Sequence, residues 1–246
     1  MSAPQPDVRR WTGVSAFAVA VALVVEVTAK LTMGVRPELD QDAALVDYVE
    51  DARAAIITVI LADTVLMASL IVFLGCFRQL VTVSHPNVRW VADVAHGAGL
   101  VFIAVTLVGD ALDGGTALDV SGLEPDPSAI RAMIEGHVLM FGSIGSVLLA
   151  LVSGTSAYLI FLTAVVPRWT GVLAAIAAVS NLVWAPTAFG GTSPTNFAAA
   201  GGWGNAVMAV FPWLVWVICI GITTVRGQVY FERRLQTHQP AGSVAP

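Results

Sequence analysis

The chain has 246 residues, of which 57% are hydrophobic and only 12% are charged. Soluble globular domains carry roughly 25% charged residues, so this composition excludes a protein whose whole surface faces water. The net charge of -5 gives no indication of nucleic-acid binding, and two cysteines, Cys76 and Cys219, are too few for a disulfide or metal-binding framework.

Six segments are long and apolar enough to cross a bilayer, which requires about 20 mostly apolar residues. The first follows Arg9 and Arg10 and is longer than the roughly 7–15-residue apolar core of a cleaved signal peptide, so we expect it to be retained. We predict an all-α fold: one domain over residues 1–235 with six transmembrane helices arranged as three helical hairpins. In chain order the spans cover residues 11–33, 54–77, 90–112, 137–165, 169–188 and 204–225.

Two segments outside the spans show helical signals. Residues 40–53 favour a short amphipathic helix, because Leu45 and Val49 are one turn apart. Residues 128–137 are expected to extend the fourth span beyond the bilayer. The acidic stretch 113–126 is expected to be a loop.

Prolines and polar residues set the remaining boundaries. Pro186 is expected to end the fifth helix, and Pro212 to kink the sixth. The connection 189–202 is uncharged and rich in Gly, Thr and Asn. The polar tail 236–246 is predicted to be disordered.

The distribution of arginines predicts the orientation. Cytoplasmic segments of membrane proteins carry an excess of Arg and Lys. With the N-terminus inside, the cytoplasmic set is Arg9, Arg10, Arg78, Arg89, Arg168, Arg226, Arg233 and Arg234, and the external set is Arg36, Arg53 and Arg131. We therefore predict a multi-pass protein of the bacterial plasma membrane with both termini in the cytoplasm.

Each outward-running helix begins with an Arg-Trp pair, and Trp11, Trp90 and Trp169 are 79 residues apart. Three repeated hairpins would produce this spacing, since internal repeats are common in transporters. Arg and Trp are also the residues that any helix prefers at a membrane interface. Beyond the Thr-Gly-Val that follows Trp11 and Trp169 the segments barely match, so we favour the interface explanation.

Ionisable residues inside the spans are the best pointers to function, because a charge at mid-bilayer costs about 2.5–3.5 kcal/mol. Counting ~1.5 Å per helical residue places most of them in the outer half of the membrane, with Asp63 deepest. We predict a polar pocket there that opens to the exterior. Its proposed ligand-binding residues are Glu26, Lys30, Asp63, Asp110, His137, Asn181 and Trp184.

The chemistry of such a pocket follows from its side chains. Of two carboxylates held close together, one keeps a proton near neutrality, and a neighbouring histidine titrates in the physiological range. This combination suits proton coupling, cation binding or acid/base catalysis. Asp63, Glu26 and His137 are the candidates for a catalytic role.

Each of these residues also has a structural interpretation. Glu26 and Lys30 are four residues apart in the favoured order for a helical ion pair, and could satisfy each other at the interface. Asp110 and Asp113 could mark the end of the third helix in water, and His137 could line the same interface. The structural interpretation is weakest for Asp63, because this residue is furthest from either surface of the membrane.

A second polar group, Asp93 and His96, lies close to Arg89 and near the cytoplasmic face, where we interpret it as an interfacial cluster. His96 and His137 are near opposite faces, so a bis-His haem is not expected. The chain has no nucleotide-binding loop, zinc-protease motif or serine-hydrolase motif. We predict no metal and no cofactor.

Two further patterns concern packing. Small residues recur every four positions on the fourth helix, and this spacing lets helices approach closely; they are Gly142, Ser146, Ala150 and Gly154. Trp213 and Trp216 could line an aromatic-walled cavity or face lipid.

The stretch Val166-Pro167-Arg168-Trp169-Thr170-Gly171-Val172-Leu173 follows an apolar helix. It resembles a group of uncharacterised bacterial six-helix membrane proteins with a Pro-Arg-Trp-x-Gly turn before the fifth helix. The resemblance covers the general layout of the whole chain and implies no site or activity. A high Ala, Val and Gly content with a single lysine also resembles proteins of high-GC bacterial genomes.

Three functional hypotheses follow. The first, which we favour, is a protein that binds or transports a small molecule, ion or proton through the outer pocket. The second is an embedded isomerase or cyclase that protonates a lipidic substrate, with Trp184, Trp213 or Trp216 stabilising positive charge. The third is a non-catalytic membrane subunit. The expected partners are the lipid bilayer and small molecules; the sequence indicates neither oligomeric state nor whether the protein is an enzyme.

Overall fold

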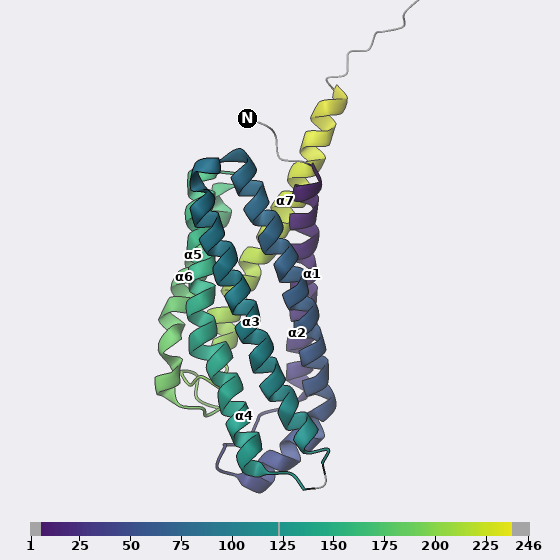
Figure 1. Cartoon of the computed structure of the whole chain (residues 1–246), viewed down its shortest axis with the longest axis vertical. Coiled ribbons are helices and arrows are strands. Elements are labelled where there is room, and N and C mark those ends of the chain that lie inside the picture. The colour runs from purple at the N-terminus through teal and green to yellow at the C-terminus, as the bar shows by residue number, and fades with distance from the viewer. Residues whose placement is uncertain (1–5, 123, 238–246) are drawn as a thin grey trace, which may run out of the picture.

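The computed structural model describes residues 6–122 and 124–237, and these residues form helices joined by short connections (Figure 1). The elements are α1 Pro6–Thr32, α2 Asp42–Ser84, η1 Pro86–Val88, α3 Arg89–Asp119, α4 Pro127–Leu139, η2 Met140–Ile144, α5 Gly145–Thr163, α6 Arg168–Trp184, η3 Ala185–Gly190, η4 Ala206–Val210 and α7 Phe211–Thr237. The short elements η1 and η3 are 3₁₀ turns, whereas η2 and η4 are π-helical turns within longer helices.

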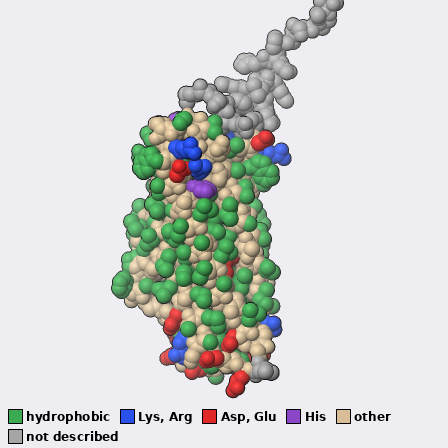
Figure 2. Space-filling model, viewed as in Figure 1, with side chains coloured by type: hydrophobic (Ala, Val, Ile, Leu, Met, Phe, Trp, Pro, Cys, Tyr) green, Lys and Arg blue, Asp and Glu red, His purple; other side chains and the backbone are tan. Residues whose placement is uncertain are grey.

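Six helical segments are long and apolar enough to cross a membrane: α1, α2, α3 with η1, α4 to α5 through η2, α6 with η3, and η4 with the first part of α7. The protein is therefore a multi-pass membrane protein, as the composition indicates. Figure 2 shows apolar side chains over the middle of the molecule and charged side chains at its two ends.

The six spans form a closed ring. Each span packs on the next one in the chain, and α7 returns to pack on α1. The connections 33–41, 120–122 with 124–126, and 191–205 lie at one end, which we name the acidic end after Glu38, Asp42, Asp119 and Asp126 (Figure 1). The start of α1, the connections 85–88 and 164–167 and the end of α7 lie at the other, which we name the arginine end after Arg10, Arg78, Arg89 and Arg168.

Helix α2 is longer than a bilayer is thick. Its 43 residues correspond to about 65 Å at 1.5 Å per residue, against a hydrocarbon core of about 30 Å. The amphipathic segment predicted at residues 40–53 is the start of this helix and not a separate one. Leu45 and Val49 are buried in an apolar cluster with Ile130 and Ile134 of α4, so α2 and α4 support each other beyond the membrane.

Helix α3 continues through Asp119, so the loop predicted at 113–126 begins only after two more turns. Thr116 and Ala117 are fully buried, and Ala117 packs in the same cluster, which holds the added turns in place. The interpretation of Asp110 and Asp113 as the end of the helix is therefore wrong. The next helix, α4, begins where the Asp126 carboxylate accepts a hydrogen bond from the Ser128 N–H at 2.9 Å, an ordinary N-cap.

The later helix ends agree in part with the prolines. Helix α6 ends at Trp184, and the chain passes into η3 at Pro186, as predicted. Helix α7 runs through Thr237 and so covers the first two residues of the tail predicted to be disordered. Residues 238–246 of that tail lie outside the described residues.

The packing of the spans decides which way the two tryptophans face and supports the small-residue pattern at one position. Trp213 and Trp216 are 5% and 0% exposed, so they face the interior and not lipid. At the small residue Gly154, an added methyl group would lie 3.6 Å from Ala178 of α6, so α5 and α6 approach closely there.

Candidate functional site

Three carboxyl groups converge inside the bundle from three successive helices. Glu26 of α1, Asp63 of α2 and Asp110 of α3 are 6%, 1% and 2% exposed. The carboxyl of Asp63 lies within hydrogen-bonding reach of both Glu26 and Asp110. We name these three residues the carboxyl cluster. Their convergence follows from the ring order, because α2 packs between α1 and α3.

One cation accompanies these three carboxyl groups. Lys30, the only lysine of the chain, donates from Nζ to Glu26 Oε1 at 2.5 Å. The same ammonium lies 5.5 Å from the ring centre of Phe141, within the range of a cation–π contact. Both carboxyl oxygens of Asp110, and Oδ2 of Asp63, are buried and receive no hydrogen bond from a donor among the described residues. If all three carboxyl groups were ionised, the cluster would hold more negative charge than Lys30 can balance.

His137 closes one side of the site. Its Nδ1 lies 3.1 Å from the carbonyl oxygen of Gly109, the residue before Asp110, and its ring lies 4.7 Å from Phe141. A methyl group on Gly109 would lie 3.0 Å from the Phe141 ring, so glycine allows α3 to approach η2 here. Phe141 belongs to the π turn η2, and such turns occur frequently at functional sites.

Further ionisable residues lie on the acidic-end side of the cluster. Asp113, one turn beyond Asp110 on α3, interacts electrostatically with Lys30 and His137, and also with Tyr48 and Arg36. Burial lowers the pKa of Arg36, and the nearby Tyr48, Asp113 and Glu38 oppose this effect.

The first and last connections are tied together at the acidic end. Arg36 Nη2 donates to the Thr192 carbonyl at 2.7 Å, and Ser193 Oγ donates to Glu38 Oε1 at 2.6 Å. One hydrogen bond donated from each connection therefore holds the uncharged segment that follows η3 against the first connection.

Two of the three carboxyl groups lie nearer the acidic end. Glu26 is 6 residues from the last residue of α1, and Asp110 is 9 residues from the last residue of α3. Asp63 is 21 residues from either end of α2, so it lies midway along its helix and is the deepest of the three.

Asn181 and Trp184 belong to a different set of contacts. Asn181 Nδ2 donates to the carbonyl oxygens of Ala177 at 2.9 Å and Ala209 at 3.2 Å. The Trp184 ring packs 5.3 Å from that of Phe197. Both residues lie on α6, which packs on α5 and α7, whereas the carboxyl cluster lies on α1, α2 and α3. The residues predicted to bind a ligand thus divide into two groups.

Sequence reasoning missed Phe141 and η2. A phenylalanine in an apolar helix has no polar signal, and its neighbours are decided by long-range packing. The glycines around it, at positions 136, 142 and 145, mark a weak point in the helix and could have indicated the irregular turn.

The polar group at the arginine end is an exposed ion-pair cluster. Asp93 is 46% exposed and pairs with Arg78 at 2.5 Å and with Arg89 at 3.9 Å. Figure 2 shows basic, acidic and histidine side chains gathered near this end. Such exposed pairs contribute little stability, typically 0–1 kcal/mol, and the geometry suits a helix boundary.

Over residues 6–122 and 124–237, no group of three or more His, Cys, Asp or Glu side chains is arranged to hold a metal ion. No family model matches the chain, and no curated protein or solved structure is significantly similar to it. The functional argument therefore rests on the geometry of the carboxyl cluster.

Proposed function

We propose that this membrane protein binds and releases protons at the carboxyl cluster, as part of the transport of an ion or small molecule. The observation that carries the proposal is the burial of Glu26, Asp63 and Asp110 around a single lysine. With all three carboxyl groups ionised and Lys30 charged, the cluster would carry a net charge of -2 inside an apolar bundle.

Physical chemistry disfavours that charged state. An isolated charge in a low-dielectric interior costs several kcal/mol, and the group takes up a proton instead. Lys30 balances one carboxylate, so the other two need protons or a bound cation. Carboxyl groups within hydrogen-bonding reach of each other also need a proton between them, because an ionised carboxylate only accepts hydrogen bonds.

The burial of the three carboxyl groups is compatible with a ligand as small as the proton. Neither of the two hollows best defined in the described bundle is lined by a carboxyl group. One is a small apolar cavity between α2, α3, α5 and α7; the other is an open groove on the outer face of α6. Lys30 and Phe141 occupy the space beside the carboxyl groups.

The orientation follows from the arginines. Under the positive-inside rule the arginine end faces the cytoplasm, with both termini, and the acidic end faces the exterior. Asp113, His137 and Arg36 then line the side from which protons reach the cluster. The bacterial plasma membrane remains the location that the sequence favours.

The embedded-enzyme hypothesis receives less support. It needs an aromatic ring near the acid to stabilise a developing cation. Trp213 and Trp216 line a cavity that contains no acidic residue, and Trp184 packs on Phe197. The aromatic ring beside the cluster is that of Phe141, and the Lys30 ammonium already lies over its face.

Asp63→Asn tests the proposal. In purified protein subjected to a small pH jump in weak buffer, an indicator dye reports the protons taken up. We expect Asp63→Asn to reduce the proton uptake, because a side-chain amide does not bind a proton at a pH near neutrality. Asp47→Asn, an exposed carboxylate on the same helix, is the matched control.

The possible outcomes separate the hypotheses. Equal loss in Asp63→Asn and Asp47→Asn at a pH near neutrality would contradict a special role for the buried group. Unchanged uptake after combined replacement of Glu26, Asp63 and His137, with only stability altered, would favour the non-catalytic subunit.

A further inference from the structure

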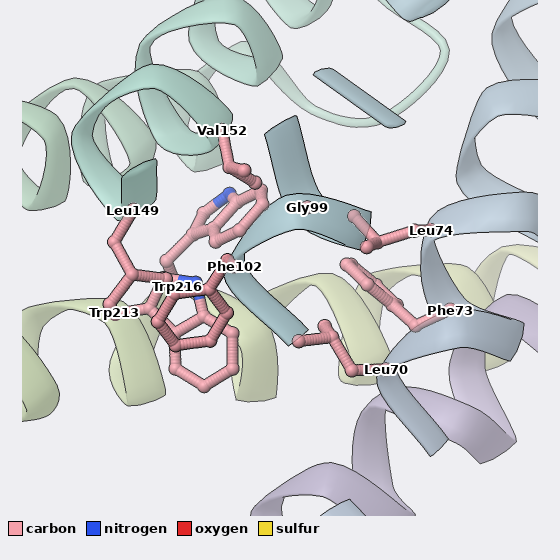
Figure 3. Close-up of a pocket in the computed structure, with 9 residues that line it drawn as sticks. All are labelled: Leu70, Phe73, Leu74, Gly99, Phe102, Leu149, Val152, Trp213 and Trp216. Atoms are coloured by element: carbon pink, nitrogen blue, oxygen red, sulfur yellow. The ribbon is translucent and has the colours of Figure 1, made fainter. Parts of the chain in front are cut away.

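A layer of large apolar side chains lies between the carboxyl cluster and the arginine end. It surrounds a cavity of about 10 Å³, lined by Leu70, Phe73, Leu74, Gly99, Phe102, Leu149, Val152, Trp213 and Trp216 (Figure 3). A cavity of this size holds at most one water molecule, and an apolar one stays dry. The layer is therefore a barrier to water and protons.

The position of the layer follows from the helices that carry it. Leu70 is seven residues beyond Asp63 on α2, or about 10 Å closer to the arginine end. Phe102 precedes Asp110 by eight residues on α3, or about 12 Å in the same direction. The barrier thus lies between the cluster and one side of the membrane, while Asp113 follows the cluster along α3 toward the other.

Trp213 and Trp216 of α7 supply the largest side chains of this layer. Trp216 packs edge-on against Phe73, with ring centres 6.1 Å apart and an angle of 83°. In Figure 3 both indoles lie beside Leu149, Val152 and Phe102. The Nε1 atoms of both rings are buried without a hydrogen-bond partner among the described residues, so packing alone holds the indoles in place.

A weak point of α7 lies directly before these two rings. Pro212 has no N–H and cannot donate to the Met208 carbonyl four residues earlier. The hydroxyl of Ser180 on α6 donates to that carbonyl instead, and Asn181 donates to the next one, Ala209. The π turn η4 precedes Pro212; prolines and π turns are where helices bend.

We infer that Trp213 and Trp216 form a plug that closes the carboxyl cluster toward the arginine end, and that bending of α7 at η4 and Pro212 withdraws it. The inference rests on the proposed function, since it names the second access route of the same proton-binding site. Transport requires that one site reach each side in turn, and the plug lies on a helix with a built-in hinge.

Proton permeability of liposomes tests the plug. The full-length protein is reconstituted with a trapped pH-sensitive dye, and a pH gradient is imposed under valinomycin and potassium. We expect Trp216→Ala to raise proton entry severalfold over wild type, because removing the indole opens the layer. Trp216→Phe should keep proton entry at the wild-type rate, since it retains ring volume and loses only an unpartnered N–H.

Two variants make the result specific. Trp90→Ala removes a tryptophan that is 68% exposed at the bundle surface, and should leave the rate unchanged. Asp63→Asn combined with Trp216→Ala should abolish the added entry, because the route passes through the cluster. Trp213→Ala replaces Trp216→Ala in the series if the latter does not elute as a folded protein.

The inference is overturned if folded Trp216→Ala and Trp213→Ala are as tight as wild type. It is equally overturned if Trp216→Phe leaks as much as Trp216→Ala, or if the added entry persists with Asp63→Asn. None of these results affects the proton uptake of the solubilised protein, so failure of the plug is distinguishable from failure of the proposed function.

Discussion

The charge balance of the carboxyl cluster is decided by single residues. Lys30 is 41% exposed along its side chain, while Glu26 is 8% exposed, so the ion pair lies at the edge of the buried site. Its ammonium also contacts Phe141. Lys30 therefore links α1 to both the carboxyl groups and η2, and the sequence contains no other lysine.

Lys30→Met should lower the melting temperature, because Glu26 would lose its partner while remaining buried. Breaking a fully buried ion pair costs about 3–5 kcal/mol. Because the Lys30 side chain is partly exposed, we expect the loss here to be at most about 3 kcal/mol. Glu26→Gln in the same background should recover most of the loss, since both charges are then gone. Circular dichroism in detergent measures both effects. Equal melting of wild type and Lys30→Met would mean that the pair is immaterial.

At the scale of elements, the two π turns distinguish this bundle from a set of regular helices. Each lies beside a group of polar contacts: η2 carries Phe141 next to His137 and Lys30, and η4 offers backbone carbonyls to Ser180 and Asn181. Inside a membrane every backbone polar group needs a partner. The polar side chains of α6 therefore serve the irregular part of the sixth span.

Ser180→Ala should destabilise the protein by about 1–3 kcal/mol, the cost of leaving a buried carbonyl unpaired. In the Pro212→Ala background the cost should shrink, because residue 212 regains the N–H that can serve Met208. Thermal melting of the four proteins of this cycle measures the coupling. Ser69→Ala is the matched control, since its hydroxyl is exposed and bonds only within its own helix.

An identical effect of Ser180→Ala with and without Pro212 would contradict this account of the hinge. It would indicate that an N–H at residue 212 does not take the place of the Ser180 hydroxyl at the Met208 carbonyl.

The whole molecule is a ring of six spans with chemically different ends. Arginines gather at one end and carboxylates at the other. Two members of the cluster, Glu26 and Asp110, lie toward the acidic end of their helices, and the proposed plug lies on the arginine side of the cluster. This asymmetry makes the orientation in the membrane decisive for the direction of proton movement.

Cysteine labelling tests the orientation. With Cys76 and Cys219 replaced by alanine, Ser121→Cys at the acidic end should react with an impermeant maleimide on intact cells. Asn87→Cys at the arginine end should react only after permeabilisation. Both positions are exposed. The reverse pattern would place the acidic end inside the cell and make the arginine-based orientation wrong.

The sequence by itself determined the properties that depend on local composition. Apolar length fixed six spans, Pro186 ended α6, and the cost of charge in lipid singled out Glu26, Asp63 and Asp110. Element boundaries beyond the bilayer were less accurate, because packing of Leu45 and Ile130 lengthened α2, and packing of Ala117 lengthened α3.

Only the tertiary structure decided which residues meet. Both faces of a transmembrane helix are apolar, and lipid provides no hydrophobic driving force between helices, so hydrophobic pattern does not tell which face points inward. The ring order therefore had to be seen before Asp63 could be placed between Glu26 and Asp110. The same order places α6, with Asn181 and Trp184, against α5 and α7 and away from the cluster, and packing turns Trp213 and Trp216 into the interior.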